Sequence, residues 1–414
     1  MDERSALYRS LAGEPIARRV EGLPGSSPWQ QAACWALAPA VGAFSQWVLG
    51  RALKDGVRRL YFLSRDGWHF YHMAQRLCRA WGLPVECRYL YGSRYAWRLP
   101  LYHTDHRRAL SQLESGRTPP TAEGVLRQAG LSPEERAGVL GELAVSGKRP
   151  LSPGERRALF QKLKACPRFL FLMDRNSRQA LPGLAGYLRQ EGLLEGVPWA
   201  LVDSGWMGST QETLAQALAL LGAAQGPRGY YWGLYRAPQL GRWACYSFSP
   251  GRELKRQAGF CPGFFEAALA APQGMALGYE ERRGRFIPRL GDPPHGGTLS
   301  RELEALFADY GEKLLQEGAP RNLLGRAVAE LPQVSSLLEQ LMTWPTRQEA
   351  SAFGALPFWD SPLEGAAGPL ASPPGGKSPW PEGSTALYGK CPKQELAALR
   401  ARRWARVLRL AWRA

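Results

Sequence analysis

Two polar, glycine-containing loops carry the residue types that bind phosphate groups. The first loop is Ser64-Arg65-Asp66-Gly67, which follows the apolar run 59–63. The second extends from Asp203 to Gln211 and follows the apolar run 199–202. A glycine-containing turn from a strand into a helix directs backbone N–H groups and the helix dipole at an anion. We therefore predict a phosphate site at the second loop, although a capped strand-to-helix turn would use the same residue types.

The side chains of these loops would add specific contacts to the backbone cradle. Arg65 offers a planar, bidentate donor that suits a phosphate, but a surface pair of Arg65 with Asp66 would have the same sequence. Asp203 can accept hydrogen bonds from sugar hydroxyl groups. Close backbone approach and further hydroxyl donors would come from Gly205, Gly208, Ser209 and Thr210.

A third polar segment, Ser93-Arg94, follows the strand-like run 88–91. Ligands of open α/β sheets bind beyond the carboxyl ends of the strands. If the three strands are neighbours, the loops converge on one edge and Arg94 adds a second cation there. Three converging loops are stronger evidence for a site than any one of them.

Other chemistries find little support in the sequence. No Gly-Lys-Ser/Thr follows the second loop, so it is not a P-loop, and the chain has no Gly-x-Ser-x-Gly elbow of a serine hydrolase. The pairs His69-x-x-His72 and His103-x-x-His106 lack a third ligand at zinc spacing and are expected to be packed or solvated. Nucleic acid is not an expected partner, because no basic stripe with interleaved aromatic residues occurs in the α/β part.

Hydrophobic periodicity predicts the elements that position these loops. A helical pattern over 68–81 places Met73, Leu77 and Trp81 on one face. The strands expected around it and later in the chain are 59–63, 88–91, 199–202 and 229–235. Strand, helix and strand in this order form a βαβ unit, for which parallel pairing is the default. We predict an α/β fold built on a parallel sheet.

Composition shifts divide the chain into six segments. Residues 105–195 are rich in Leu, Ala, Glu and Arg, whereas 355–392 are rich in Pro, Gly and Ser. The expected segments are a first part of the α/β domain (1–104), a helical insertion (105–195), a second part of the α/β domain (196–295), a helical region (296–354), a Pro/Gly/Ser-rich linker (355–392) and a basic amphipathic helix (393–414).

The overall composition fits a folded protein with an anionic partner. Of the 414 residues, 45% are hydrophobic, and 53 Lys and Arg against 36 Asp and Glu give a net charge of +17. The seven cysteines are scattered without a C-x-x-C pair, which favours a reducing, cytoplasmic location. The most apolar stretch, 32–50, is interrupted by Pro39 and polar residues, so we expect a buried helix rather than a membrane span.

Three blocks of the sequence together resemble a bacterial family of glycan phosphoribosyltransferases. The blocks are LYFLSRDG (60–67), YLYGSR (89–94) and VDSGWMGSTQ (202–211), and the resemblance covers about residues 30–290. Members transfer a 5-phosphoribosyl unit from phosphoribosyl pyrophosphate to a hydroxyl group of a glycan in capsule or O-polysaccharide biosynthesis, and they are often fused to a haloacid-dehalogenase-like phosphatase. The resemblance implies a phosphoribosyltransferase-like parallel sheet with a helical insertion and a mainly helical C-terminal region.

The resemblance also implies a role for each loop. Residues 64–67 would bind the pyrophosphate, and residues 207–211, from Met207 to Gln211, would hold the 5-phosphate. Asp203 and Ser204 would face the ribose hydroxyls, where salvage phosphoribosyltransferases usually have two adjacent acids.

The implied reaction needs charge neutralisation and a base. Arg65, with Mg²⁺, would neutralise the leaving pyrophosphate, and a carboxylate must accept the proton of the acceptor hydroxyl. Asp66 and Glu266 are both candidates for that base. The implied partners are phosphoribosyl pyrophosphate, a lipid-linked glycan acceptor and a separate phosphatase.

Two other functions compete with the transferase. A haloacid-dehalogenase-like phosphatase needs an Asp-x-Asp pair after its first strand, whereas this chain has Ser64-Arg65-Asp66 there and no Asp-x-Asp elsewhere. A non-catalytic sugar-phosphate-binding scaffold of a glycan assembly complex would keep the loops without turnover.

The C-terminal helix separates basic from apolar residues. At 100° per residue, one stripe holds Arg402, Arg406, Arg409 and Arg413, and the remaining arc holds Trp404, Val407, Leu408, Ala411 and Trp412. Such a helix suits the headgroup region of an anionic membrane, with the preceding linker as a tether. The alternative is a helix that packs its apolar face on the protein.

Overall fold

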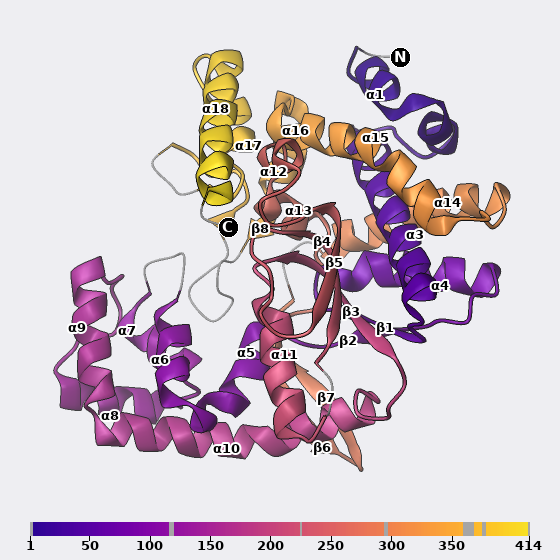
Figure 1. Cartoon of the computed structure of the whole chain (residues 1–414). Helices are drawn as coiled ribbons and strands as arrows, with labels where there is room; N and C mark the ends of the chain where they lie inside the picture. The colour runs from indigo at the N-terminus through magenta and orange to yellow at the C-terminus, as the bar shows by residue number, and fades with distance from the viewer. Residues whose placement is uncertain are drawn as a thin grey trace.

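A central sheet of five parallel strands organises this computed structural model, which describes residues 3–115, 120–223, 226–293, 297–358, 368–374 and 378–412. The strands are β1 (Arg59–Leu63), β2 (Glu86–Leu90), β3 (Trp199–Trp206), β4 (Arg228–Leu234) and β5 (Arg242–Phe248). Their order in the sheet is β2-β1-β3-β4-β5 (Figure 1). The predicted α/β fold with a parallel sheet is confirmed.

Helices cover both faces of the sheet because the inner strands are apolar on both sides. In β1, Leu60 and Phe62 pack into one core, while Tyr61 and Leu63 pack into another on the opposite face. The first core includes α3 (Ala38–Asp55), α4 (Gly67–Ala80), α14 (Gly297–Gln316) and α15 (Leu323–Thr343). The second includes α5 (Arg94–Arg98), α10 (Pro167–Gln190) and α11 (Ser209–Leu220).

The chain changes face between the neighbouring strands β1 and β3. Helix α4 follows β1 on one face of the sheet, and α11 follows β3 on the other. At such a switch point the loops after the two strands diverge, and open α/β sheets bind ligands in the crevice between them. These are the two loops that the sequence predicts to carry the chemistry.

The predicted helical insertion contains a hydrophobic core of its own. Its helices project from one side of the molecule (Figure 1). They are α6 (His106–Glu114), α7 (Ala122–Gln128), α8 (Pro133–Leu143), α9 (Pro153–Lys164) and the first half of α10. Helices α8 and α9 begin after Ser132 and Ser152, and each of these serines forms a capping box with the glutamate three residues later.

Strand β3 is longer than predicted. The prediction ends the strand at Val202, but pairing with β4 continues to Trp206. Asp203, Ser204 and Gly205 therefore belong to the strand, and the turn shrinks to Met207-Gly208. Asp and Gly are depleted in strands, yet pairing with the buried strand β4 overrides that preference here.

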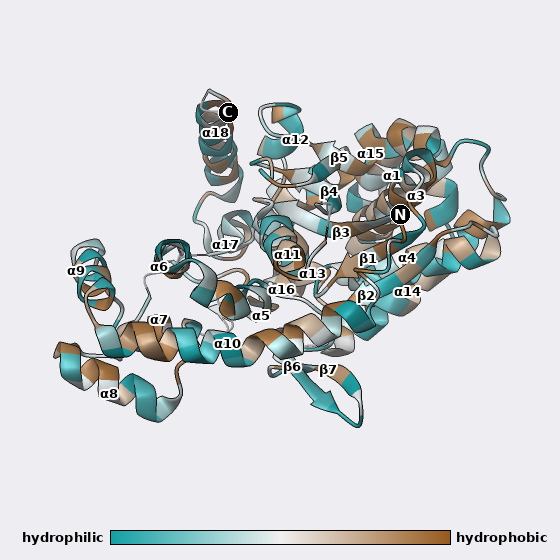
Figure 2. Cartoon of the chain, turned by 60° about the horizontal axis from the view of Figure 1, so that its bottom comes forward, coloured by the Kyte–Doolittle hydropathy of each residue, from teal (hydrophilic) through white to brown (hydrophobic). Residues whose placement is uncertain are grey.

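Several further elements have no counterpart among the predicted strands and helices. They are β5, α12 (Leu254–Ala258), α13 (Pro262–Ala268) and the antiparallel hairpin of β6 (Ala276–Arg282) and β7 (Arg285–Leu290). The hairpin packs against α10, and its tip is hydrophilic (Figure 2).

The region 355–392 is not the free linker that its composition predicts. It contains the short strands β8 (Pro357–Phe358) and β9 (Gly368–Pro369) and helix α17 (Pro381–Tyr388), which packs on α16 (Arg347–Gly354). Trp380 is fully buried, and its Nε1 donates to the Met342 carbonyl oxygen at 2.8 Å. Although this segment is rich in Pro, Gly and Ser, a few large apolar residues hold it against the rest of the protein. Residues 359–367 and 375–377 lie outside the described part.

The N-terminal helices form part of the core. Helix α1 (Glu3–Val20) packs on α15, and α2 (Pro28–Ala32) leads through a π-helical segment (Ala33–Leu37) into α3. The stretch Pro28–Asp55 is long and apolar enough to cross a membrane, but its apolar window is entirely buried inside the protein. The predicted burial of this stretch is therefore confirmed.

Candidate functional site

The loops after β1 and β2 are joined at the carboxyl edge of the sheet. Ser64 donates a hydrogen bond to the Gly92 carbonyl oxygen at 2.8 Å and accepts one from the Gly92 N–H at 3.0 Å. The two bonds hold the first loop beside the segment that leads to Arg94. Ser64 therefore positions the loops relative to each other.

Three carboxylates converge at this edge: Asp66 after β1, Asp203 in β3 and Glu266 in α13. The Ser204 hydroxyl donates to Asp66 Oδ2 at 2.5 Å. Trp206 Nε1 donates to Glu266 Oε1 at 2.5 Å. Strand β3 thus supplies one carboxylate and the hydrogen-bond donors that orient the other two.

The environment of Asp66 and Asp203 favours protonation of their carboxyl groups. Burial raises the pKa of Asp203 well above its usual value, and the negative charges of Asp66 and Glu266 raise it further. Burial also raises the pKa of Asp66, against the opposing effect of the Arg65 and Arg94 charges. Buried carboxylates that repel one another are suited to bind a cation or to move a proton.

Two arginines flank the carboxylates. Arg65 is half-buried and Arg94 is exposed, and the charge of each lowers the pKa of Asp66. Within the described part of the chain, neither guanidinium group has a hydrogen-bond or salt-bridge partner. Both are therefore available to an anionic ligand at the crevice.

The short turn Met207-Gly208 leads from β3 into the N-terminus of α11. The N–H groups in the first turn of a helix have no intrahelical partner, and here they belong to Ser209, Thr210 and the following residues. The hydroxyl groups of Ser209 and Thr210 make no hydrogen bond within the described ranges. Met207 is exposed beside them. This end of α11 can therefore receive an anion.

Three of the predicted glycines are required by the fold itself. Gly208 has a φ of 64°, and a Cβ there would lie 2.5 Å from Pro238 Cγ. At Gly205 a Cβ would lie 2.0 Å from the Gly233 carbonyl oxygen in β4, and at Gly67 a Cβ would lie 3.0 Å from backbone of β1. Substitution of these glycines would disturb packing as well as any ligand.

Ser93 has internal hydrogen-bond partners. Its hydroxyl accepts from the Ala96 N–H at 2.9 Å, which caps α5, and donates to the Ala276 carbonyl oxygen at 2.6 Å. Both functions of the hydroxyl are therefore used within the protein, and Arg94 is the member of this loop that can reach a ligand.

Gln211 is also engaged inside the protein. It is fully buried, donates to the Leu240 carbonyl oxygen at 2.7 Å and accepts from the Tyr231 hydroxyl at 2.8 Å. These bonds fix residues 235–241, the short connection that returns the chain from β4 to the parallel strand β5. The side chain of Gln211 therefore supports the fold rather than a phosphate.

Trp206 is a site residue that the sequence prediction does not include, and Arg98 is a half-buried cation on the same short helix as Arg94. Trp206 lies inside the third block, and its indole N–H holds Glu266. A tryptophan among small polar residues is the feature of the sequence that could have indicated this role. Arg98 follows Arg94 by one turn of α5, which packs on α11. Its buried Nε has no partner in the part of the chain that the structure describes, and burial lowers its pKa. The spacing of four residues places both cations on one helix face.

The carboxylates allow a magnesium site but not a closed protein cage. Among the described residues, no group of three His, Cys, Asp or Glu side chains could hold a metal ion. Mg²⁺ commonly binds through one or two carboxylates together with substrate phosphates. Asp66 and Asp203 have the donor chemistry for that mode.

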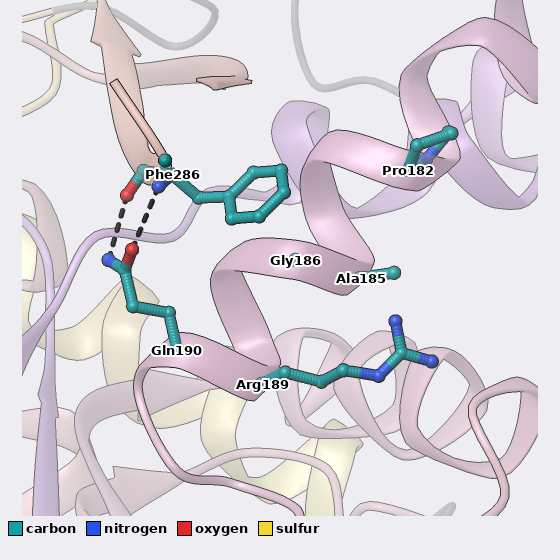
Figure 3. Close-up of a pocket in the computed structure, with 7 residues that line it drawn as sticks. Pro182, Ala185, Gly186, Arg189, Gln190 and Phe286 are labelled. Carbon is teal, nitrogen blue, oxygen red and sulfur yellow. Dashed lines mark hydrogen bonds between the residues drawn. The ribbon is translucent and has the colours of Figure 1, made fainter. Parts of the chain in front are cut away.

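Two cavities lie apart from the carboxylates. One of about 450 Å³ is lined by α10 and β7, where Gln190 and Phe286 form a pair of 2.8 Å hydrogen bonds (Figure 3). The other, of about 760 Å³, lies between α4 and α14. The lining of neither cavity includes Asp66, Asp203 or Glu266.

These features define an α/β protein with a doubly wound parallel sheet and a polar site at its switch point. Comparison of the sequence with known protein families and with curated proteins finds no match. The function is therefore inferred from the residues and geometry of the site.

Proposed function

We propose that this chain is a glycan phosphoribosyltransferase, which transfers a 5-phosphoribosyl unit from phosphoribosyl pyrophosphate to a hydroxyl group of a glycan. The observation that supports this best is the convergence of Asp66, Asp203 and Glu266 with Arg65 beside the N-terminus of α11. The donor carries a ribose between a phosphate and a pyrophosphate. An acidic centre between cationic groups complements such a molecule, and all of these residues except Glu266 lie in the blocks that resemble the family.

In this proposal, each part of the donor meets a different element. The 5-phosphate binds at Ser209 and Thr210, and Asp203 accepts hydrogen bonds from the ribose hydroxyls. Arg65 and Arg94 bind the pyrophosphate. Asp66 and Asp203 would hold Mg²⁺, which when bound neutralises part of the pyrophosphate charge.

The reaction forms a bond between the acceptor oxygen and ribose C1 while the bond from C1 to pyrophosphate breaks. The acceptor proton passes to a carboxylate, and Asp66 and Glu266 both lie within the acidic centre. A carboxylate whose pKa is raised toward neutrality is a more effective base at physiological pH. The product keeps its 5-phosphate, which a separate phosphatase would remove.

Pyrophosphate release tests this function. The full chain would be incubated with phosphoribosyl pyrophosphate, Mg²⁺ and lipid-linked glycans extracted from bacterial membranes. We expect release that depends on the glycan. Release without glycan dependence, or release of inorganic phosphate in its place, would contradict the transferase and favour a hydrolase.

Ser209→Glu tests the phosphate cradle without disturbing the glycines. An acidic residue in the first turn stabilises a helix by about 0.3–1 kcal/mol, but it would repel the 5-phosphate. We expect an unchanged or higher Tm and a Kd for phosphoribosyl pyrophosphate that rises at least about 10-fold. Ser209→Ala, which removes a hydrogen bond worth about 0.5–1.5 kcal/mol, should weaken binding about 2- to 10-fold. Equal binding by Ser209→Glu and wild type would place the 5-phosphate elsewhere.

Attachment to an anionic membrane is a second part of the proposal. Fewer residues of the C-terminal helix remain available for it than the sequence predicts. Helix α18 (Pro392–Ala411) packs on α12 and α17, and Val407 is buried in that contact. Arg403 pairs with the buried Glu382, so this face stays on the protein. Leu408 and Trp412 are exposed, the latter to 94%. Arg413 lies outside the described residues.

A charge-matched pair of variants tests this attachment. Replacing the exposed Arg402, Arg406 and Arg409 with alanine should weaken binding to anionic vesicles about 100-fold, since each contributes about 1 kcal/mol. The control is a triple alanine variant of Arg157, Lys164 and Arg168 in the helical insertion, which loses the same charge. Co-sedimentation should fall for the first variant alone, and equal loss in both would indicate a net-charge effect.

A further inference from the structure

The lining of the cavity between α4 and α14 includes none of the residues proposed to bind the donor. It has a volume of about 760 Å³ and lies along three turns of α4, from His69 to Ala80, a length of about 16 Å. An elongated cavity of this size suits a chain-like ligand. The lining residues that carry the argument are His69, His72, Met73, Glu304 and Phe307.

Two imidazole nitrogens in the cavity wall have no partner. His69 is 1% exposed, and its Nδ1 makes no hydrogen bond within the described residues, although its Nε2 lies 3.4 Å from Ser300 Oγ. His72 Nε2 is likewise unpartnered and lies 3.8 Å from Glu304 Oε1. Buried polar atoms of this kind are normally satisfied by protein, water or a ligand.

The wall favours a neutral, hydroxyl-rich ligand. Burial lowers the pKa of His69 to about 3, so its ring is uncharged and offers one donor and one acceptor. A hydroxyl group matches such a ring because it also donates and accepts. Met73 and Phe307 provide apolar surface for the carbon face of a sugar ring.

Other ligand classes fit this wall less well. Glu304 and Glu312 would repel a phosphate, and Arg76 is already paired with Glu312. The remaining arginines of the lining, Arg79 and Arg301, are exposed. A lipid chain would leave the imidazole nitrogens unsatisfied, which is costly for buried polar groups.

The cavity is linked to the carboxylates by the first turn of α4. Trp68 lies two residues after Asp66, and its Nε1 donates to Glu304 Oε2 at 3.2 Å. Its ring contacts His72 with centroids 4.3 Å apart and Tyr89 with centroids 5.2 Å apart. The end of the cavity at His69 is therefore about one helical turn along α4 from Asp66.

We propose that the cavity between α4 and α14 binds uncharged sugar residues of the glycan acceptor, next to the residue that receives the phosphoribosyl unit. The role as acceptor site rests on the proposed transferase function, whereas the binding of neutral sugars can be measured without it.

Blocking the cavity from its rim tests the inference. Ala305 lines the cavity and is exposed on α14, so Ala305→Trp fills the space without changing the core. The matched control is Ala137→Trp, at an exposed alanine of α8 in the insertion. The probes are neutral oligosaccharides of glucose, galactose, mannose and rhamnose, with binding followed by saturation-transfer NMR and titration calorimetry.

We expect at least one oligosaccharide to bind wild type and Ala137→Trp equally, and Ala305→Trp at least about 10-fold more weakly. His72→Phe keeps an aromatic ring but loses the nitrogens, and should weaken binding about 2- to 10-fold. No binding by any probe, or equal binding by Ala305→Trp, would overturn the inference. The affinity for phosphoribosyl pyrophosphate, measured on the same samples, reports on the donor site alone and so distinguishes a failure of the proposed function.

Discussion

Asp66→Asn is expected to lower kcat, by about 10²- to 10⁴-fold if Asp66 rather than Glu266 is the general base, and to stabilise the folded protein at neutral pH. Asparagine keeps an oxygen that can accept the hydrogen bond from Ser204. The folded-state pKa of Asp66 is raised by burial above its unfolded value of about 3.9. The folded wild type therefore binds more protons than the unfolded chain between those two pKa values, and its stability falls as the pH rises through that window.

The variant lacks this titration, so its gain in Tm should be largest above the raised pKa and should vanish below about pH 4. Thermal unfolding across pH, with kcat measured on the same samples, checks both effects. Asp309→Asn, at an exposed position of α14, is the control and should change neither. Full activity of Asp66→Asn, or a loss of stability at neutral pH, would remove Asp66 from the acidic centre.

Glu266→Gln separates the two candidate bases. Glutamine can still accept the hydrogen bond from Trp206. The pH profile of kcat/KM should lose its acidic limb in the variant of whichever residue, Asp66 or Glu266, accepts the proton. The other variant should keep the limb at a lower rate.

Arg65→Ala is expected to lower kcat/KM about 10- to 150-fold, because a hydrogen bond to a charged group contributes about 1.5–3 kcal/mol. The kcat/KM of Arg65→Lys should lie between those of Arg65→Ala and wild type, since lysine keeps the charge but lacks the planar fork of arginine. The fold should survive, because Arg65 has no salt-bridge partner among the described residues.

Arg58→Ala is the matched control for Arg65. Arg58 is exposed at the opposite end of β1, so its loss removes the same charge away from the site. Steady-state kinetics of pyrophosphate release with both variants measure the difference. An undiminished rate for Arg65→Ala, or equal losses in the two variants, would place the pyrophosphate elsewhere.

The inner strands and the helix starts could be predicted because their signals are local. Tyr61 and Phe62 lie in a continuous apolar run that ends at a polar turn, and Ser132 begins a capping box within four residues. Strand β3 could not be predicted to its end, since the polar residues Asp203 and Ser204 are held in the sheet by pairing with β4. That pairing joins segments that are distant in sequence.

The candidate site was predictable in position but not in the use of each side chain. Type and spacing indicate the edge where Asp66 and Asp203 meet, because loops after neighbouring parallel strands share an edge. Whether a hydroxyl or amide faces a ligand depends on tertiary partners. The Gln211 side chain accepts a hydrogen bond from the Tyr231 hydroxyl, and the Ser93 hydroxyl donates one to the carbonyl oxygen of Ala276.

A crystal structure with phosphoribosyl pyrophosphate and Mg²⁺ tests the central proposal most directly. The account predicts the ribose hydroxyls at Asp203, the 5-phosphate at Ser209 and Thr210, and the pyrophosphate at Arg65. Density for the ligand in the cavity between α4 and α14, or an empty switch point at saturating ligand, would contradict it.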